Sequence, residues 1–551
     1  MLDSVLIVSE AFCIGGLETH LAGEMRKLAK RGCRVHFAVG REFCRDLLPE
    51  SLVSVSSGLR FGCNGSVADI LHDVALLRAL IRKEHIECLH LHPYSTLIPG
   101  ALAAELEGVP YVVTLHGPAS LGRLHGATFE FILKYLVLPA AGLVVVISEE
   151  VRQLASAFVS DGRIVNLPNA VDAEEFSGEC NSSLAVDARW LVVSRLDYHK
   201  IVGILDFAVK AEAAGITGLR IVGDGEAKGE LERRLVEAGL TGFAEFLGAR
   251  ADVPCLMQRS VGVAGMGRVV LEAVACGKPA VLVGYDGVKG VINHKLLEAA
   301  AVANFSGRNL VTCDTPELAK ALSTVEPLNC SSLPPNLGLF FDEGRIWEKF
   351  FRYVDAVSYQ GPTLLTEVNK CLLDEDWDTE PFLQSPKTHA HLGLLVNSVR
   401  HVKPHLNLAF INYSAQFEAS ATSISVAQQL AEKDARAQEL AQEVITLDAH
   451  AQALAREVGA RDAGAQLLAQ QLAEKDAQAQ ELAQEVIRLD AHAQVLAREV
   501  GARDADAQLL ALDLIHARAE MGVMRKTIRK QDAILVYFRP SLWVEKLRRI
   551  F

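Results

Sequence analysis

Short apolar runs alternate with amphipathic helical patterns along the first third of the chain. Near-continuous apolar runs are typical of parallel strands buried on both faces, and helical patterns between them make βαβ units. The predicted strands are Val5–Ser9, Arg34–Val39, Cys88–Leu91, Tyr111–Leu115 and Leu143–Ile147. We therefore expect an α/β, Rossmann-like domain over residues 1–170.

The same pattern restarts near residue 190. The second set of predicted strands is Trp190–Val193, Leu219–Val222, Ala244–Leu247, Val261–Ala264 and Ala280–Val283. We expect a second doubly wound domain over residues 171–358, with a ligand site between the two domains. Residues 359–420 have a mixed pattern, from which we expect a linker with some helix.

A 14-residue repeat occupies residues 431–514 in six copies. Fourteen residues are two heptads, and apolar residues recur in them with alternating spacings of three and four, which predicts a coiled-coil seam. We expect a long α-helical coiled coil over residues 421–515 that makes the chain a homo-oligomer; a solvated single helix is the alternative. One seam position is leucine in all six copies: Leu440, Leu454, Leu468, Leu482, Leu496 and Leu510.

The last segment, 516–551, is basic and rich in apolar and aromatic residues. Eight lysines and arginines against two acids lie between Arg525 and Phe551. A short helix of this composition suits an anionic membrane surface, here the inner face of the membrane. A helix packed as a cap on the coiled coil is the alternative.

Composition narrows the class of protein. A formal net charge of −13 over 551 residues argues against non-specific binding to nucleic acid. The 11 cysteines include no CxxC pair, which favours reduced thiols in a cytoplasmic protein over a disulfide framework or a zinc site. The most apolar stretch, Tyr135–Ile147, is too short to span a bilayer, so we expect a soluble chain, at most attached to a membrane surface.

A glycine turn after the strand at Val263 leads into a helix that carries one acid, Glu272. The free N–H groups and positive dipole end of a helix start attract an anion, and glycine lets a phosphate come close. Glu272 lies further along the helix, where it could accept both hydroxyls of a ribose. Tight helix–strand packing is the alternative explanation for the glycines. The candidate donor-binding residues of this turn are Gly265, Met266, Gly267, Arg268 and Val269.

Two cations, Arg195 and Lys200, follow another predicted strand. Cations at the carboxyl end of a strand face the crevice of an open α/β sheet, where they could neutralise a leaving diphosphate. Surface salt bridges are the alternative. Gly223 and Gly225, in "IVGDGE", form a further strand-end turn on the same edge.

The first domain offers a second loop of this kind and several histidines. Gly15 and Gly16 follow the first strand and precede a helix, which is compatible with a phosphate. His116 ends the strand in "TLHGP", where a role at the site and a structural role are equally open. For His90 and His92, at a third strand end, a core role is favoured.

In their order along residues 1–358, these motifs resemble the family 4 retaining glycosyltransferases with the GT-B fold. The "GG-x-E" loop, the strand-end histidine, "ISEEV", "PNAVDAEEF", the R-x4-K pair, "VGDGE" and "GMGRVVLEAVACGKP" carry the resemblance. "FFDEGRIWEKFFRYVDAV" (Phe340–Val357) is similar to the family's final helix, which returns to the first domain.

The resemblance implies that Arg195 and Lys200 hold the nucleotide diphosphate and that Glu272 anchors the ribose. Backbone amides of the glycine turn would meet phosphate and sugar. His116 would lie near the transferred sugar, and Gly15 and Gly16 near the phosphate and the acceptor.

One residue departs from the family pattern. The family's E-x7-E motif has its first glutamate close to the donor sugar, and this chain has Ala264 at that position, eight residues before Glu272. Two classes of function therefore stay open: an active enzyme, and a non-catalytic GT-B scaffold that organises a polysaccharide assembly complex through its coiled coil. A nucleotide-sugar epimerase is a third, which the Arg195/Lys200 spacing disfavours.

Of these we expect the enzyme, a hexosyltransferase-type glycosyltransferase of cell-envelope polysaccharide or lipopolysaccharide biosynthesis. It would move a sugar from a nucleoside diphosphate sugar to a hydroxyl of a lipid-linked or polysaccharide acceptor. No carboxylate pair suggests the double displacement of retaining glycosidases, so front-side attack fits better. No metal-ligand cluster accompanies the motifs, and we expect neither a metal nor a cofactor.

Overall fold

The computed structural model describes residues 2–417, with gaps at 14–15, 41–42, 63, 122–125, 174–175, 177–186, 331–332, 375–380, 400–404 and 415, and parts of 473–491. The predicted coiled coil, 421–515, lies mostly outside the described residues, although those described within 473–491 are helical. The basic tail, 516–551, lies wholly outside them. Residues 1–414 form one compact unit and residues 415–551 another.

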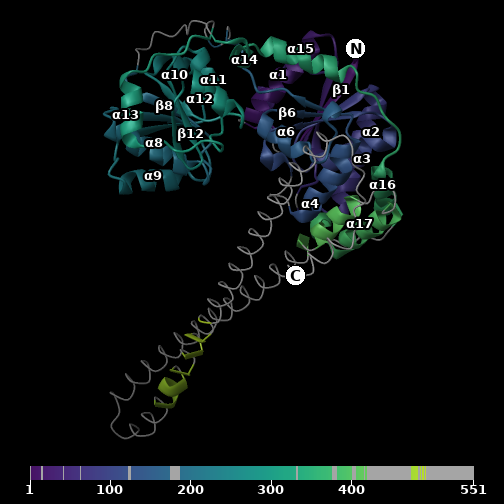
Figure 1. The fold of residues 1–551 in the computed structure, drawn as a ribbon. Coiled ribbons are helices and arrows are strands. Elements are labelled where there is room, and N and C mark those ends of the chain that lie inside the picture. The colour runs from purple at the N-terminus through teal and green to yellow at the C-terminus, as the bar shows by residue number, and fades with distance from the viewer. Residues whose placement is uncertain are drawn as a thin grey trace, which may run out of the picture. The chain divides into compact units, whose positions relative to one another are not determined.

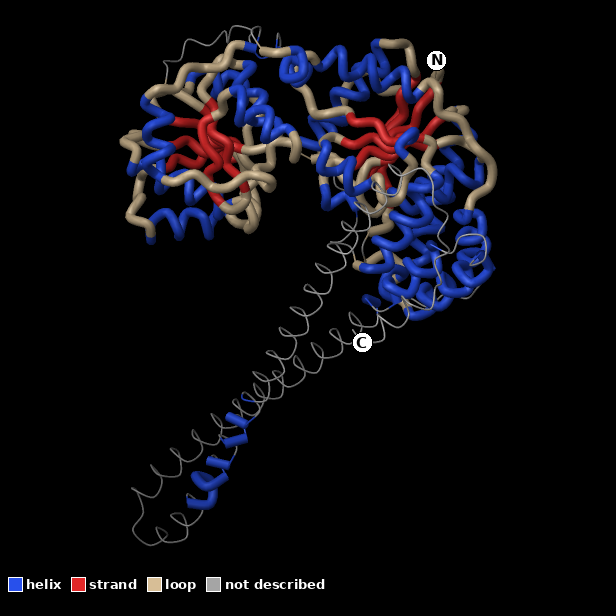
Figure 2. Tube along the Cα trace, in the orientation of Figure 1, coloured by secondary structure: helices blue, strands red, loops and turns tan. Residues whose placement is uncertain are grey.

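A seven-stranded parallel sheet forms the first domain, in the order β3-β2-β1-β4-β5-β6-β7. Figure 2 shows each of the two sheets in red among blue helices. The strands are β1 (Ser4–Ser9), β2 (Arg34–Gly40), β3 (Ser54–Leu59), β4 (Cys88–Leu91), β5 (Tyr111–Leu115), β6 (Leu143–Val146) and β7 (Ile164–Asn166). The helices between them are α1 (Gly16–Lys30), α2 (Val67–Glu84), α3 (Leu97–Glu107), α4 (Ala127–Ile132), α5 (Leu138–Ala140) and α6 (Glu149–Ala155), with a π-helical turn at Leu133–Val137.

A six-stranded sheet forms the second domain, in the order β10-β9-β8-β11-β12-β13. Figure 1 labels two of its strands, β8 and β12, among the helices of the domain. Its strands are β8 (Trp190–Val193), β9 (Leu219–Val222), β10 (Ala244–Gly248), β11 (Val263–Gly265), β12 (Ala280–Gly284) and β13 (Gly287–Val291), of which only β13 pairs antiparallel. Its helices are α8 (Ile201–Ala213), α9 (Lys228–Glu237), α10 (Val253–Arg259), α11 (Arg268–Ala275), α12 (His294–Ala301), α13 (Thr315–Ser323) and α14 (Pro335–Gly338).

The strand order reverses beside the first strand of each domain, at β1 and at β8. In open α/β sheets such a reversal opens a crevice at the carboxyl ends of the strands, where ligands bind. The loops after β1, β4, β8 and β11 flank these two points, and four predicted site residues lie in the last two of these loops: Arg195, Lys200, Met266 and Gly267.

The apolar runs predict ten strands, and all ten are present with small shifts at their ends. The largest shift is at β11, which begins two residues later than predicted because Val261 is exposed and Gly262 packs against the Trp190 ring. Three further strands are present without an apolar run to predict them. Of these, β3 is a polar edge strand with alternating burial, and β13 contains two glycines.

The final helix of the family-like segment, α15 (Glu343–Val354), packs against the first sheet as expected. On its apolar face, Ile346, Trp347 and Phe350 belong to a buried cluster that also contains residues of β4, β5 and β6. Asp355, just beyond it, accepts the backbone N–H of Leu2 and pairs with Arg31. The chain thus returns to the domain in which it began.

The interval 359–420 adds helices to the first domain. It contains α16 (Leu364–Asp374), α17 (Pro386–Val399) and a further helical segment at 405–414. Asn369 donates to the Leu102 carbonyl of α3, and the Phe382 N–H donates to the Gly65 carbonyl. Most of this interval is therefore part of a packed layer over α3 and its neighbours.

One cysteine departs from the expectation of reduced thiols. Cys255, in α10, is disulfide-bonded, whereas Cys33, Cys88, Cys276 and Cys313 are free. Within the described part of the chain, no helix combines the length and apolarity that a membrane crossing needs.

Candidate active site

Both predicted cations lie in the loop between β8 and α8, and one carboxylate joins them. Arg195 Nε donates to Asp197 Oδ2 over 2.9 Å, and Lys200 Nζ lies 3.2 Å from the same oxygen. The Arg195 side chain is 63% exposed and that of Lys200 only 16%. Lys200 precedes the first turn of α8, so its charge is held at the carboxyl edge of the sheet.

Asp197 is a residue that the sequence analysis missed. Burial alone would raise its pKa, but Lys200 and Arg195 outweigh burial and hold the pKa below its ordinary value. Burial in turn lowers the pKa of Lys200, against the opposing effect of Asp197. The only sequence signal was the position of an acid between the two cations. Asp197 is therefore the carboxylate that both cations contact in this structure.

Gly223 and Gly225 support this loop through close backbone packing. A Cβ at Gly223, whose φ is 133°, would overlap the Ser194 carbonyl, and one at Gly225 would approach the Leu196 carbonyl to 2.5 Å. The Leu196 N–H also donates to the Asp224 carbonyl. Glycine is therefore required at these positions because two backbone segments lie in contact.

The glycine turn before α11 combines packed and open positions. A Cβ at Gly265 would lie 2.6 Å from Cγ1 of Val269, so this glycine is a packing residue. Gly267 has φ of 65° and open space where a Cβ would be, although its N–H already donates to the Phe305 carbonyl over 2.8 Å. The side chains of Met266 and Val269 pack against the domain core and are partly buried.

Glu272 lies within α11, one turn from Arg268. Arg268 Nε lies 3.2 Å from Glu272 Oε1, and the other end of the guanidinium donates to the Ala170 carbonyl over 2.8 Å. Both side chains are largely buried, at 12% and 14% exposed. Arg268 thus orients the predicted ribose anchor and links α11 to the segment that follows β7.

Ala264, at the position of the family's first glutamate, is fully buried in β11. It pairs with Val192 on one side and Val281 on the other, and its side chain belongs to an apolar cluster with both. The site therefore has no carboxylate at this position.

In the first domain, Gly16 is the first residue of α1, and Gly15 lies outside the described residues. Gly16 is exposed, with open space where a Cβ would be. Burial raises the pKa of Glu18, while backbone hydrogen bonds and the positive charge of Arg195 act against that rise. Arg195 is therefore within electrostatic reach of the start of α1.

His116 follows β5 and belongs to a cluster of histidines that the sequence analysis did not foresee. Its Nε2 lies 2.9 Å from Nδ1 of His92, and its ring meets that of His20 edge-on at 5.1 Å between centroids. Burial lowers the pKa of His20 to about 3 and that of His92 to about 4, and it holds the pKa of His116 well below its ordinary value. These three rings are neutral near pH 7.

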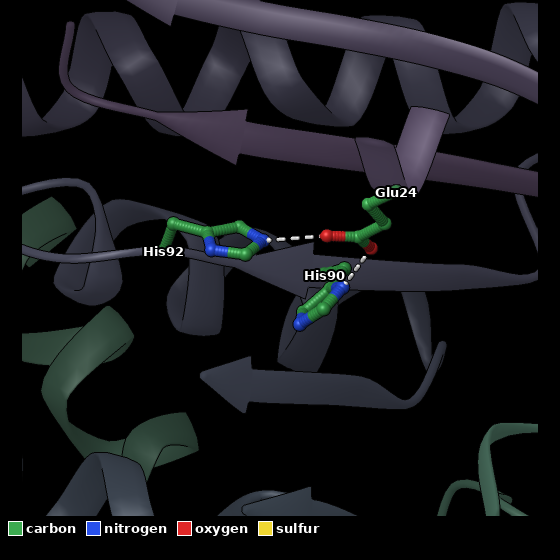
Figure 3. A group of neighbouring side chains, drawn as sticks. All are labelled: Glu24, His90 and His92. Carbon is green, nitrogen blue, oxygen red and sulfur yellow. Dashed lines mark hydrogen bonds and ion pairs between the residues drawn. The ribbon is translucent and has the colours of Figure 1, made fainter. Parts of the chain in front are cut away.

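A buried acid, Glu24 of α1, contacts His90 and His92 (Figure 3). His90 Nδ1 is hydrogen-bonded to Glu24 Oε1, and His92 Nε2 lies 3.3 Å from Glu24 Oε2. His90 Nε2 also bonds the Thr114 hydroxyl over 2.7 Å. The core role predicted for His90 and His92 is confirmed, since neither is more than 2% exposed.

Glu24, His90 and His92 also have the residue types and proximity of a metal site, with ligand atoms within 4.8 Å of one another. Three of the four ring nitrogens, however, already have hydrogen-bond partners: Glu24 and Thr114 for His90, and His116 for Nδ1 of His92. The fourth, Nε2 of His92, lies 3.3 Å from Glu24 Oε2 without a hydrogen bond. A zinc ion would have to break these contacts to reach its usual bonds of about 2 Å. The arrangement fits a hydrogen-bonded chain better than a ligand set.

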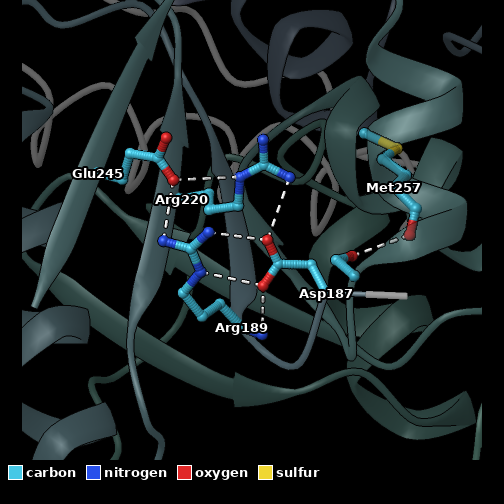
Figure 4. Close-up of polar contacts among 6 residues, drawn as sticks. Asp187, Arg189, Arg220, Glu245 and Met257 are labelled. Carbon is cyan, nitrogen blue, oxygen red and sulfur yellow. Dashed lines mark hydrogen bonds and ion pairs between the residues drawn. The ribbon is translucent and has the colours of Figure 1, made fainter. Parts of the chain in front are cut away.

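A second polar network lies at the opposite end of the second sheet (Figure 4). Asp187 binds Arg189 through two hydrogen bonds of 2.9–3.0 Å and lies 3.3 Å from Arg220, and both arginines also contact Glu245. These residues lie near the amino ends of β8, β9 and β10. They tie strands together away from the carboxyl edge, so they are not site candidates.

Comparisons with known proteins agree with this architecture. The model of Glycosyltransferase Family 4 matches residues 14–175, and that of Glycosyl transferases group 1 matches residues 188–325. A curated relative is the Escherichia coli UDP-Gal:alpha-D-GlcNAc-diphosphoundecaprenol alpha-1,3-galactosyltransferase, 28% identical over 274 residues, which are 44% of this chain and 70% of the relative.

Solved structures of similar shape include Anabaena HepE in complex with UDP and glucose, 19% identical, with a TM-score of 0.48 and covering 64% of this chain and all of HepE. Another is WaaG, a glycosyltransferase involved in lipopolysaccharide biosynthesis, 15% identical, with a TM-score of 0.42 and covering 68% of this chain and all of WaaG. Because the two family models together match more than half of the 551 residues, in the order of the two domains, this chain belongs to the family 4 glycosyltransferases with the GT-B fold.

Proposed function

We propose that this protein is a retaining glycosyltransferase that moves a sugar from a nucleoside diphosphate sugar to a hydroxyl of a lipid-linked or polysaccharide acceptor in cell-envelope biosynthesis. The observation that carries the proposal is the convergence of Arg195 and Lys200 on one carboxylate at the carboxyl edge of the second sheet. The curated relative uses UDP-Gal and a diphosphoundecaprenol acceptor, which supports this donor and acceptor chemistry.

Binding would begin with an exchange of partners in the β8–α8 loop. The diphosphate replaces Asp197 as the main partner of Arg195 and Lys200, which hold it through charge-assisted contacts. Glu272, oriented by Arg268, accepts the ribose hydroxyls. Backbone N–H groups at the start of α11 face the phosphates, and His116 lies against the sugar.

The proposed reaction is a front-side displacement at the anomeric carbon. The acceptor hydroxyl oxygen forms its bond on the face from which the diphosphate oxygen leaves, so the configuration is kept. The hydroxyl proton passes to the leaving diphosphate, and the bond between the anomeric carbon and that oxygen breaks. Negative charge grows on the diphosphate as the bond breaks, so preorganised cations there lower the barrier. No step of this scheme calls for a metal ion.

Hydrolysis of UDP- and GDP-sugars by the full-length protein, followed as released nucleotide, tests the proposal. Arg195→Ala should lower turnover by at least about 100-fold, the loss typical of removing one transition-state donor. Glu272→Ala should lower kcat/KM strongly, because it removes the acceptor of the ribose hydroxyls. Arg233→Ala is the matched control: Arg233 pairs with Glu230 and Glu237 on the exposed face of α9, and its loss should leave turnover unchanged.

Two results would contradict the proposal. Turnover that survives both Arg195→Ala and Glu272→Ala would place the chemistry elsewhere. Calorimetric titration that shows no binding of either UDP- or GDP-sugars would instead favour the non-catalytic scaffold.

A further inference from the structure

We propose that Glu24 is a positioning residue that acts through His92 to fix the tautomer of His116. The inference rests on the proposed function, because His116 is the residue expected beside the transferred sugar. It concerns a side chain on α1 that the proposed reaction does not itself use.

The three residues form a chain across three elements of the first domain. Glu24 comes from the middle of α1, His92 directly follows β4, and His116 directly follows β5. Oε2 of Glu24 lies 3.3 Å from Nε2 of His92, and Nδ1 of His92 lies 2.9 Å from Nε2 of His116. Glu24 and His92 are fully buried, whereas His116 is partly exposed. The chain therefore runs from the core to an accessible ring.

The charge of Glu24 decides which nitrogens carry protons. Burial would raise the pKa of Glu24, but His90 and His92 outweigh burial and hold it below its ordinary value, so Glu24 is ionised. Oε2 of Glu24 and Nε2 of His92 approach to 3.3 Å and neither atom has a hydrogen-bond partner, so their contact is electrostatic. A carboxylate oxygen has no proton to donate and repels a lone pair, so the facing Nε2 of His92 favours the proton. A neutral imidazole has one N–H, and Nδ1 of His92 is therefore an acceptor.

The same reasoning extends to His116. Because Nδ1 of His92 accepts, Nε2 of His116 must donate, and the neutral ring of His116 keeps a lone pair on Nδ1. In the opposite tautomer of His92, a lone pair would face the Glu24 carboxylate. The buried charge thus presents Nδ1 of His116 as a hydrogen-bond acceptor, the form that can receive a sugar hydroxyl.

His90 takes the other oxygen of Glu24. Its Nδ1 bonds Oε1, and its Nε2 is held by Thr114. Glu24 is therefore fixed from two sides, but only the contact with His92 leads to His116. This difference supplies a matched control inside one buried cluster.

The experiment uses the full-length protein labelled with ¹⁵N-histidine and two readouts. The first is the tautomer of His116, read from its ring ¹⁵N shifts and assigned with His116→Gln. The second is kcat and KM for hydrolysis of the sugar nucleotide that turns over best. In the wild type we expect the Nε2–H tautomer at His116.

Glu24→Leu removes the acceptor while keeping the volume. We expect a mixed or inverted tautomer at His116 and a kcat lowered by about 10- to 100-fold, the range seen when an orienting partner of a functional histidine is lost. KM should change little. Glu24→Gln keeps an oxygen that can accept from His92 and should restore part of both readouts. Thr114→Val, which alters only the His90 side, should keep the wild-type tautomer and kcat.

Circular dichroism and Tm check that each variant is folded, because they report on the first domain, which holds Glu24 and His92, as well as on the second. If Glu24→Leu does not fold, His92→Asn cuts the same chain while leaving the Glu24–His90 pair, and the same losses are expected. A double variant of Glu24 and His92 should lose no more than the larger single loss, because both act through one chain.

Three outcomes would overturn the inference. One is wild-type kcat and tautomer in a folded Glu24→Leu or His92→Asn variant. Another is an equal loss in Thr114→Val. The third is one equivalent of metal per chain that Glu24→Leu releases, since a metal-bound Nε2 of His92 carries no proton. A wild type that turns over no donor would refute the proposed function, while the ¹⁵N shifts would still report the tautomer.

Discussion

Ala264 departs from the motif of the family that the chain belongs to, and β11, the strand that carries it, is intact. It lies eight residues before Glu272, yet it is fully buried between Val192 and Val281 rather than turned toward the predicted phosphate site. Position 264 is part of the apolar core that supports β11. The chain therefore has the Arg268–Glu272 pair but no acid at position 264.

Restoring the family's glutamate should for this reason harm the protein. In Ala264→Glu a carboxylate would enter the cluster without a cation beside it, at a cost of several kcal/mol. We expect a lower Tm and no gain in donor hydrolysis. Ala251→Glu, at an exposed position of the same domain, is the control and should leave Tm nearly unchanged. A rise in turnover in Ala264→Glu at unchanged Tm would show that position 264 faces the donor.

At the scale of elements, the sequence predicted what depends on local pattern. Continuous apolar runs locate the inner strands, and residues that follow them, such as Arg195 and His116, are correctly placed at carboxyl edges. The polar edge strand β3 and the glycine-containing β13 lack that pattern and were missed. The chain from Glu24 to His116 was also missed, because it joins α1, β4 and β5 across more than 60 residues of sequence and no local spacing encodes it.

The histidines His20 and His92 of the first domain should make the stability of the protein depend on pH. The pKa values of His20 and His92 are lowered by burial to about 3 and about 4, whereas both would titrate near 6.5 in the unfolded chain. Between pH 6.5 and 4 the unfolded chain therefore binds more protons than the folded one. The contribution that the neutral rings of His20 and His92 make to the free energy of unfolding is fully present above pH 6.5. It is lost as the pH falls toward 4.

We accordingly expect Tm to fall between pH 7 and pH 5. Each such histidine can add up to about 1.4 kcal/mol per pH unit to the loss. Glu24 does not contribute in this window, because its stabilisation is lost only below the ordinary carboxyl range. Tm is to be measured from pH 7 to 5 in the wild type and in His20→Gln. The variant lacks one titrating histidine, so its Tm should fall less over this range. Equal slopes would mean that His20 does not keep its neutral form in the folded protein.

At the scale of the whole molecule, the catalytic unit and the repeat region are separate. Residues 1–414 form one compact unit, which already includes the return helix α15 and the helices of 359–414. The sequence pattern predicts only a linker with some helix over 359–420, because the apolar residues there are too scattered to indicate that they cover α3. The repeat region is predicted from a different kind of evidence, the 14-residue period of the sequence. This period predicts association between chains and no catalytic role.

Removal of the repeat region should therefore abolish oligomerisation and leave turnover unchanged. A chain that ends at Phe417 should be monomeric by light scattering and should keep the donor hydrolysis of the full-length protein, because it retains the whole compact unit and both cations. Full-length protein with Leu482→Asp and Leu496→Asp should also lose its oligomeric state, since charge in the seam opposes packing of apolar side chains. Gln480→Asp and Gln494→Asp, outside the predicted leucine positions, should not. A full-length chain that is itself monomeric would refute the coiled coil, and an oligomer that survives truncation would place the interface on the GT-B unit.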